Sequence, residues 1–598
     1  MNPKQTLKQH FGYDSFREGQ EPLINDILQG KDALGIMPTG AGKSLCFQIP
    51  ALISEGITII VSPLISLMRD QVIALAQAGI PAAYINSSLN ERQIHKALLN
   101  AQNNMYKLIY IAPERLLTRD FLYFAVGADI SMVTVDEAHC ISQWGQDFRP
   151  SYTEIPKFIA HLHKRPVVSA FTATATPRVR EDIINQLALD NPTILVSGFD
   201  RPNLHFDIKK AKDKLPTLTE FLLTRRNQSG IVYCATRATV EEVCEKLNKY
   251  GYSASRYHAG LSDHERLTNQ DDFLHDRVQI MVATNAFGMG IDKSNVSFVV
   301  HYNMPKDLEG YYQEAGRAGR DGEPAECLML YSKGDVSTNL WLINNNQESE
   351  PATKERNIKR LQEMEFFSTT KECLREFILR YFGETPKSKC NNCVNCEASY
   401  EDMDITIESQ KIISCVIRMN ERFGIGIITD VLRGKNNAKV VSFRLDKLST
   451  FGISNKSKAE LTDIIDHLVL YGYLRKTADQ YPVVKLTAKS KDLLRQGASI
   501  SMKTSRKSSK RAVTSIQPPL ARVADRNLLE ALKQLRLSIA KEQNLPAFVI
   551  FHDSTLTDMC EKMPGNLDEF MNVSGVGQVK AEKYGARFIE VIQGYVAK

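Results

Sequence analysis

The sequence has no apolar run that approaches the ~20 residues of a membrane-spanning helix. Its start lacks the pattern of a secretory signal peptide, so we expect a cytoplasmic protein without a membrane partner. With 11 cysteines and no such signal, a reducing compartment is indicated, where clustered cysteines bind metals more often than they form disulfides. Acidic and basic residues nearly balance, leaving a net charge of +6. This mild basic bias permits an anionic partner without requiring one.

The composition, with 43% hydrophobic and 24% charged residues, is typical of a globular protein. Its 598 residues suggest about four modules of ~150 residues each. Short apolar, β-branched runs alternate with segments of helical spacing, which indicates α/β layers on a parallel sheet. The alternation occurs twice, up to residue 203 and again from residue 204. Only the first series contains a phosphate-binding loop.

Residues 37–44 read Met-Pro-Thr-Gly-Ala-Gly-Lys-Ser, between a predicted buried strand and a predicted helix. This context is typical of a loop that binds nucleotide phosphates, because glycines let backbone N–H groups close around phosphate oxygens. Lys43 can reach the β- and γ-phosphates, and Ser44 can offer its hydroxyl to Mg²⁺. Met37 replaces the usual first glycine, so the loop alone could also be a surface turn. We expect these residues to bind ATP: Thr39, Gly40, Gly42, Lys43 and Ser44.

Asp136 and Glu137 directly follow the apolar strand predicted at residues 132–135. At the carboxyl end of a parallel strand, Asp136 can bind Mg²⁺. Glu137 can orient or deprotonate an attacking water. An isolated acidic pair is often only a strand-end turn, but Lys43 in the same fold pattern favours the catalytic interpretation.

The second series contains two arginines three residues apart, Arg317 and Arg320, flanked by glycines. Residues with this spacing share one face of a helix. Two such guanidinium groups suit a γ-phosphate that a neighbouring lobe supplies, as an arginine finger does. The alternative is a solvated pair, which would not explain the flanking glycines.

Residues 140–150 form a predicted loop that holds Trp144, one of only two tryptophans in the chain, with Phe148 and Arg149. Aromatic rings beside an arginine can stack on bases and bind phosphate. A small packed loop would have the same composition, so both interpretations stay open at this point.

Three cysteines form a C-x₂-C-x₂-C pattern, and a fourth lies 17 residues upstream of the first. Four thiolates are the usual complement of a closed structural zinc site, although an iron–sulfur cluster also suits this pattern. The predicted ligands are Cys373, Cys390, Cys393 and Cys396.

The last third of the chain shows two further modules and a connection between them. Residues 401–496 have the helices and two-stranded wing of a winged helix, which usually binds duplex DNA but sometimes only protein. Residues 497–519, rich in Ser, Lys and Arg, are predicted to be a linker. Residues 520–598 read as a helical module, whose Gly575-Val576-Gly577 turn can present N–H groups to a DNA phosphate.

Taken together, the motifs resemble the superfamily 2 helicases and, within them, the bacterial-type RecQ family. The resemblance is carried by residues 37–44, Asp136-Glu137-Ala138-His139, the Trp144 loop, the Thr-Ala-Thr run at 172–176 and residues 313–322. It implies an α/β protein with these parts: two RecA-like parallel-sheet lobes (1–203 and 204–337), a zinc-binding helical subdomain (338–400), a winged-helix domain (401–496), a linker (497–519) and a small all-α HRDC domain (520–598).

The resemblance also implies roles for single residues. Tyr13, Arg17 and Gln20 look like the segment that reads adenine in this family. Phe548 takes the position of an aromatic residue that contacts DNA in some relatives, although a phenylalanine lacks the hydroxyl of their tyrosine. Trp144 and its neighbours would contact single-stranded DNA, and the ion at the four cysteines would be zinc.

The implied activity is ATP-dependent 3′→5′ unwinding of duplex and branched DNA in recombination, repair and the SOS response. The implied cofactors are ATP, Mg²⁺ and Zn²⁺. The implied partners are single-stranded and duplex DNA together with a single-strand DNA-binding protein, in a nucleoid-associated location. Two alternatives remain: a DNA-binding protein whose ATPase only switches states, and an RNA helicase, against which the C-terminal modules weigh.

Overall fold

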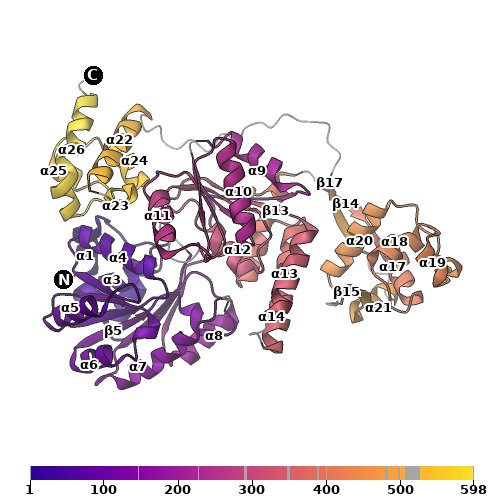
Figure 1. The fold of residues 1–598 in the computed structure, drawn as a ribbon, viewed down its shortest axis with the longest axis horizontal. Coiled ribbons are helices and arrows are strands. Elements are labelled where there is room, and N and C mark those ends of the chain that lie inside the picture. The colour runs from indigo at the N-terminus through magenta and orange to yellow at the C-terminus, as the bar shows by residue number, and fades with distance from the viewer. Residues whose placement is uncertain are drawn as a thin grey trace.

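The computed structural model describes residues 2–38, 40–145, 147–226, 228–287, 293–346, 350–386, 389–398, 400–477, 483–495, 499–505, 526–543 and 545–596. Thr39, one of the expected phosphate ligands, lies outside these ranges. Figure 1 shows two α/β lobes in contact, a small helical domain beside both of them at one end, and a separate helical domain at the other end. No helix among the described residues is long and apolar enough to cross a membrane.

Lobe 1 is built on a parallel sheet in the strand order β3-β4-β2-β5-β6-β1-β7. Every residue of β1, β2 and β4 is buried, as expected for strands with helices on both faces. The strands are β1 (Ala33–Ile36), β2 (Ile57–Val61), β3 (Ala82–Ile85), β4 (Leu108–Ile111), β5 (Ile130–Val135), β6 (Val167–Thr172) and β7 (Thr193–Val196). The helices are α1 (Pro3–Phe11), α2 (Gln20–Leu28), α3 (Lys43–Ile53), α4 (Ile65–Gln77), α5 (Glu91–Gln102), α6 (Arg119–Gly127), α7 (Ile155–His161) and α8 (Pro177–Gln186), with 3₁₀ turns at Pro113–Arg115, Ala138–Ile141 and Pro150–Glu154.

Lobe 2 repeats the design with a parallel sheet in the order β10-β11-β9-β12-β13-β8. Its strands are β8 (Leu204–Lys210), β9 (Ser229–Tyr233), β10 (Ala254–Tyr257), β11 (Ile280–Ala283), β12 (Val296–His301) and β13 (Ala325–Tyr331). Its helices are α9 (Lys214–Leu223), α10 (Arg237–Lys249), α11 (Asp263–Leu274) and α12 (Leu308–Ala315). The chain returns from the end of lobe 1 through residues 199–203, which lead directly into β8 at the sheet edge.

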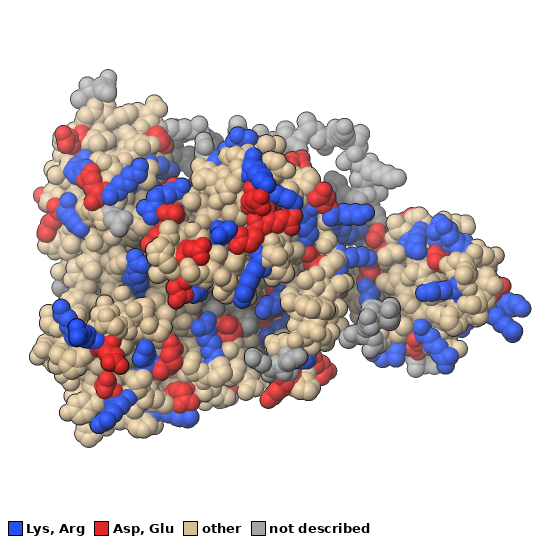
Figure 2. Space-filling view, viewed as in Figure 1, with Lys and Arg blue, Asp and Glu red and all other residues tan. Residues whose placement is uncertain are grey.

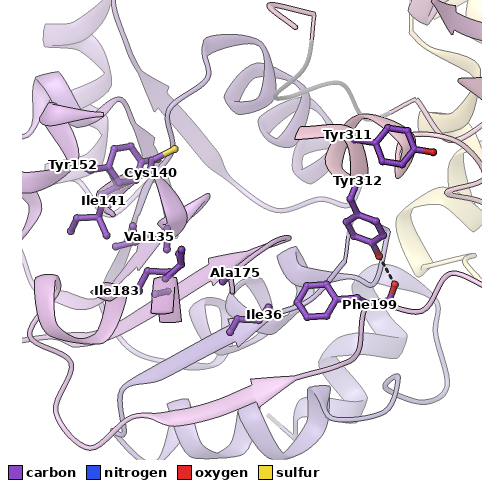
Figure 3. Packing of buried hydrophobic residues seen from close by; sticks show 14 of the residues in the cluster. Ile36, Val135, Cys140, Ile141, Tyr152, Ala175, Ile183, Phe199, Tyr311 and Tyr312 are labelled. Atoms are coloured by element: carbon purple, nitrogen blue, oxygen red, sulfur yellow. Dashed lines mark hydrogen bonds between the residues drawn. The ribbon is translucent and has the colours of Figure 1, made fainter. Parts of the chain in front are cut away.

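The zinc-binding subdomain is helical, with α13 (Lys333–Asn345), α14 (Pro351–Thr369), α15 (Leu374–Tyr381) and α16 (Val394–Glu397). Helix α13 begins at Lys333 and therefore crosses the boundary predicted at residue 337. One buried apolar cluster runs from lobe 1 through lobe 2 into this subdomain, and Figure 3 shows part of it around Phe199 and Tyr312. The ring of Phe199, between the lobes, stacks on Phe382 at 4.4 Å between centroids.

The winged-helix domain has its own apolar core. It contains α17 (Thr406–Arg418), α18 (Ile425–Leu432), α19 (Ala438–Ser442), a 3₁₀ turn (Leu445–Lys447), α20 (Lys458–Leu470) and α21 (Ala488–Arg495). The two-stranded wing predicted from the sequence is present as β15 (Leu474–Lys476) paired antiparallel with β16 (Val484–Leu486).

The structure differs from the predicted linker at 497–519 in one respect. Residues Ser501–Ser505 form β17, which pairs antiparallel with β14 (Tyr400–Asp404) at the start of the domain. Ile500 and Met502 are buried in the winged-helix core. The serines and lysines suggested a solvated tether, but these two apolar side chains and the ladder with β14 extend the domain to residue 505. Residues 506–519 lie outside the described residues.

The last domain is all-helical, with α22 (Arg526–Gln543), α23 (Ala547–Ile550), α24 (Asp553–Lys562), α25 (Leu567–Phe570) and α26 (Gln578–Val596) around one apolar core. Figure 1 places it beside α1 and α4 of lobe 1 and α11 of lobe 2. The fold class predicted from the sequence is confirmed: two parallel-sheet lobes, a zinc-binding helical part, a winged helix and a small α domain.

We expect Ile500→Ala to destabilise the winged-helix domain by about 2–4 kcal/mol, because it leaves a cavity under the β14–β17 pair. Hydrogen exchange of α17 and α20 amides in the full-length protein measures this, with the lobes as internal reference. Ile407→Ala is the matched control, since Ile407 is 68% exposed on α17 of the same domain. Equal protection in the two variants would show that the Ile500 side chain does not stabilise the domain.

Candidate nucleotide site, zinc centre and nucleic-acid surfaces

The phosphate loop joins β1 to α3 in the geometry that the sequence predicts. Gly40 and Gly42 both have φ of +84°, which favours glycine. Helix α3 begins at Lys43 without a side-chain cap, so its first N–H groups face the loop as an anion site. The Lys43 ammonium donates to the Met37 carbonyl at 3.1 Å. Met37 is itself buried in the core of lobe 1, which explains why a large side chain stands in place of the usual glycine.

The predicted adenine-reading segment contacts this loop. The Gln20 amide donates to the carbonyls of Ala41 and Gly42 at 3.1 Å each, and Arg17 donates to the Gly40 carbonyl. A β-carbon on Gly42 would lie 2.6 Å from the Gln20 amide nitrogen and would displace it, and the positive φ of Gly42 itself favours glycine. The ring of Tyr13 packs on the apolar cluster of α1, α2 and α3, and burial raises its pKa.

The carboxyl ends of the adjacent strands β5, β6 and β1 bring the other predicted groups together. Ser62 donates to Asp136 at 3.5 Å, and the Glu137 amide donates to Asp136 at 3.0 Å. His139 lies 3.3 Å from a Glu137 oxygen and 2.8 Å from the Thr172 hydroxyl at the end of β6. These contacts connect the Thr-Ala-Thr run to the acidic pair.

The surroundings of the two carboxyl groups shift their pKa values in opposite directions. Burial and the neighbouring Glu137 raise the pKa of Asp136. Burial acts in the same direction on Glu137, but the hydrogen bond and charge of His139, with Lys43 and Arg317, hold its pKa below the usual value. Glu137 also adopts a left-handed φ of +47°, a strained conformation that is common at functional sites. Glu137 therefore keeps its charge more readily than Asp136, and a cation bound at Asp136 would keep that carboxylate charged as well.

The arginines of lobe 2 meet the phosphate loop of lobe 1. A β-carbon added to Gly40 would lie 3.5 Å from the Arg320 carbonyl oxygen. Arg317 is 4% exposed, hydrogen-bonds to Tyr233 and contributes to the low pKa of Glu137. The structure therefore brings together both halves of the predicted site, from elements that lie on two different sheets.

In the aromatic loop, two guanidinium groups lie over the ring of Trp144. Arg178 of α8 lies 3.1 Å from its ring centroid and Arg356 of α14 lies 4.5 Å from it. Arg360, also on α14, donates to the Trp144 and Gly145 carbonyls. The sequence analysis missed all three arginines. The i, i+4 spacing of Arg356 and Arg360 was an available signal, whereas nothing near Arg178 pointed to Trp144.

The other two predicted nucleic-acid contacts of this loop have different surroundings. Phe148 is 36% exposed. Arg149 donates to the Pro63 carbonyl and to Asp147, at 3.0 Å each. The loop thus offers one exposed ring beside an arginine that is anchored to lobe 1.

The four predicted zinc ligands converge. Their sulfur atoms all lie within 4.8 Å of one another, and Cys390 and Cys396 are 3.8 Å apart. Tetrahedral zinc with bonds of ~2.3 Å requires sulfur atoms about 3.8 Å apart, so this cage fits the ion. Cys373 precedes α15 and Cys393 precedes α16, so helix starts orient two of the thiols.

The predicted DNA-contacting groups of the two C-terminal domains have different surroundings. Lys and Arg side chains gather on the face of the winged-helix domain seen in Figure 2. Phe548 is partly buried against the apolar cluster of the lobes. The Gly575 amide, expected to face a DNA phosphate, donates to the Gly12 carbonyl at the end of α1 at 3.0 Å. In this arrangement both groups of the last domain contact the lobes.

Two parallel-sheet lobes, with a phosphate loop on one and arginines on the other, define a helicase-type motor. Five family models match successive parts of the chain. They are the DEAD/DEAH box helicase (residues 17–183), the helicase conserved C-terminal domain (213–322), RecQ zinc-binding (333–397), the RQC domain (399–511) and the HRDC domain (525–592).

Several bacterial relatives match almost end to end, and two of them serve as examples. The ATP-dependent DNA helicase RecQ of Bacillus subtilis is 43% identical over 591 residues, covering 98% of this chain and 98% of the relative. The protein of that name from Pasteurella multocida is 40% identical over 587 residues, covering 98% and 92%. The chain belongs to the RecQ family of helicases. This confirms the resemblance and supports zinc, rather than an iron–sulfur cluster, at the four cysteines.

Lys43→Ala is expected to lower ATP hydrolysis by about 10²-fold or more while DNA affinity stays nearly unchanged, because Lys43 faces the phosphate cradle. Steady-state ATPase assays and DNA-binding titrations of the purified protein measure both. Lys31→Ala, which removes a surface lysine paired with Asp26 at 2.8 Å, is the control. Hydrolysis that survives in the Lys43 variant would refute the assignment of the loop.

Cys393→Ser is expected to reduce bound zinc and the yield of folded protein together, because structural zinc binding is folding free energy. Metal content and thermal unfolding are measured on the same preparation. Cys244→Ser, in lobe 2 outside the cysteine cluster, should keep its zinc. A stable, metal-free Cys393 variant would show that the cysteines are incidental.

Proposed function

We propose that this protein is an ATP-dependent DNA helicase that moves 3′→5′ along one strand and unwinds duplex and branched DNA in recombination, repair and the SOS response. The observation that carries the proposal is the approach of the phosphate loop at Gly40 to Arg320 of the other lobe. A site shared in this way makes nucleotide binding and lobe closure one event. The relatives named above supply the substrate class, since both are described as DNA helicases.

The residues have distinct parts in one cycle. Lys43 and the loop amides bind the phosphates, while Arg17 and Gln20 fix the adenine end. Bound Mg²⁺, held by Ser44 and Asp136, would neutralise phosphate charge; an alcohol and a buried carboxylate are the oxygen ligands this ion prefers. Glu137 orients the attacking water and accepts its proton.

Arg317 and Arg320 stabilise negative charge that develops on the γ-phosphate and are drawn toward it when ATP binds. Hydrolysis and phosphate release remove the anion that holds the two lobes together. Repeated closing and opening of the cleft would move lobe 2 along a strand bound across both lobes. In this way each round of ATP hydrolysis would move the protein one step along the strand.

Strand contact is assigned to Trp144, Phe148 and Arg149, and duplex contact to the basic winged-helix domain in Figure 2. Phe548 is a further contact, which would require the last domain to leave the lobes. A single-strand DNA-binding protein as partner, and a cytoplasmic, nucleoid-associated location, belong to the same proposal and rest on family membership.

A strand-displacement assay tests the activity. Fluorescently labelled DNA duplexes with a 3′ tail or a 5′ tail, and a matching RNA duplex with a 3′ tail, are each incubated with ATP and the protein, and Glu137→Gln serves as the hydrolysis-deficient control. We expect displacement of the 3′-tailed DNA duplex and neither of the others.

Each other outcome selects an alternative. DNA-stimulated hydrolysis without displacement would indicate a DNA-binding switch. Preferential displacement of the RNA duplex would indicate an RNA helicase, and displacement from the 5′ tail would reverse the polarity.

A further inference from the structure

Side-chain hydrogen bonds, as well as backbone pairing, hold the segment that joins the two lobes (residues 199–204) against lobe 2. At its start, the Tyr312 hydroxyl on α12 donates to the Phe199 carbonyl at 2.5 Å, the bond drawn in Figure 3. Helix α12 ends at Ala315 and leads directly into the turn that carries Arg317 and Arg320. The joining segment therefore begins in contact with the helix that presents the arginines.

Two side chains of the segment then bind the arginine turn itself. The Arg201 guanidinium donates to three backbone carbonyls: Gly316 at 3.2 Å, Ala318 at 3.0 Å and Gly319 at 2.8 Å. The Asn203 amide donates to the carbonyls of Gly319 at 2.9 Å and Glu323 at 2.8 Å.

These carbonyls lie at and just beyond the end of a helix, where they lack intrahelical partners and where a cation is favoured. The planar fork of an arginine can reach several of them at once, whereas a lysine ammonium is a single point charge. Gly319 has φ of +56°, and a β-carbon there would lie 2.4 Å from the Asn203 nitrogen, so the turn and Asn203 fit each other closely.

The zinc-binding subdomain holds the same segment through other groups. Arg375, two residues after Cys373, donates to Asp200 at 2.9 Å and to the Leu204 carbonyl at 2.5 Å. Asn392, between Cys390 and Cys393, donates to the Pro202 carbonyl at 2.9 Å. Residues 200–204 are therefore fixed between the zinc loop and the arginine turn.

We propose that Arg201 and Asn203 are positioning residues for ATP hydrolysis: they hold the 316–319 turn so that Arg317 and Arg320 reach the phosphates bound in lobe 1. This rests on the proposed role of those two arginines. Arg201 and Asn203 contact the backbone of the turn, and they act through the arginines that it presents. A small shift of a catalytic group lowers the rate of the reaction strongly, because the group accelerates it only when placed correctly at the reacting centre.

The test compares binding of two nucleotides to the full-length protein with single-stranded DNA bound. Fluorescent ADP reports the lobe 1 site, and ADP with aluminium fluoride adds a mimic of the transferred phosphoryl group, which the arginines would contact. We expect Arg201→Ala to weaken the aluminium fluoride complex and to lower kcat, each about tenfold, while affinity for ADP changes by less than about twofold. Asn203→Ala should show a smaller loss, and Arg201→Lys should be intermediate.

A double-mutant cycle separates positioning from general stabilisation. In an Arg320→Ala background, Arg201→Ala should weaken the aluminium fluoride complex by clearly less than the roughly tenfold loss expected with Arg320 present, since one of the two groups that it positions is gone. Arg225→Ala is the matched control: Arg225 is also on lobe 2 and makes several hydrogen bonds, to Glu326, Thr224 and the Phe221 carbonyl, away from the turn. It should leave both affinities unchanged.

Full additivity of Arg201→Ala and Arg320→Ala would overturn the inference, as would an equal loss in the Arg225 variant or a parallel loss of ADP affinity. Should Arg201→Ala fail to fold, Arg201→Lys and Asn203→Ala carry the same cycle. An Arg320→Ala variant that binds the aluminium fluoride complex normally would refute the proposed role of Arg320, and with it this inference. Additivity alone would refute only the positioning role.

Discussion

The structure depends on the approach of two positively charged surfaces across the cleft between the lobes. Lys43 and Arg17 lie on one side, and Arg317 and Arg320 on the other. Like charges on facing sides of a cleft repel each other, and Glu137, whose pKa Lys43 and Arg317 help to hold low, lies near both sides. In the proposed cycle a triphosphate adds negative charge between the two sides, so closure is favoured when it is bound and less favoured after phosphate leaves. On this proposal the part of the closure energy that depends on the nucleotide is electrostatic, whereas the apolar cluster that runs from lobe 1 through lobe 2 into the zinc-binding subdomain joins the lobes with or without a nucleotide.

The parts of the site that lie at the end of a single strand could be predicted from the sequence. A glycine-rich turn between a strand and a helix, and an acidic pair at a strand end, are local patterns, and parallel strands bring such ends to one edge. Met37 was ambiguous from sequence, because only the structure shows its side chain buried in the core. The C-x₂-C-x₂-C pattern was also local, whereas Cys373 lies 17 residues upstream of it. Only the structure shows the helix start that orients the Cys373 thiol.

The contacts that the sequence did not reveal join segments far apart in the chain. Arg360 reaches the Trp144 carbonyl across 216 positions, and Arg201 reaches Gly316 across 115. A single arginine carries no local signal for such a partner, because the contact exists only once two domains are assembled. Strand β17 was missed for a related reason: its polar, lysine-containing sequence resembles a tether, and its partner β14 lies about a hundred positions earlier.

The zinc-binding subdomain contacts both lobe 1 and the segment that joins the two lobes. Its helix α14 supplies Arg356 and Arg360 to the aromatic loop of lobe 1, and its zinc loop holds the segment between the lobes through Asn392. Zinc restricts that loop to one geometry, because four thiolates must meet around a single ion. On the positioning role proposed for Arg201 and Asn203, a zinc ion at the four cysteines would fix the loop that holds residues 200–204 through Arg375 and Asn392. The metal site would then be linked to hydrolysis through these contacts, without taking part in the phosphoryl transfer.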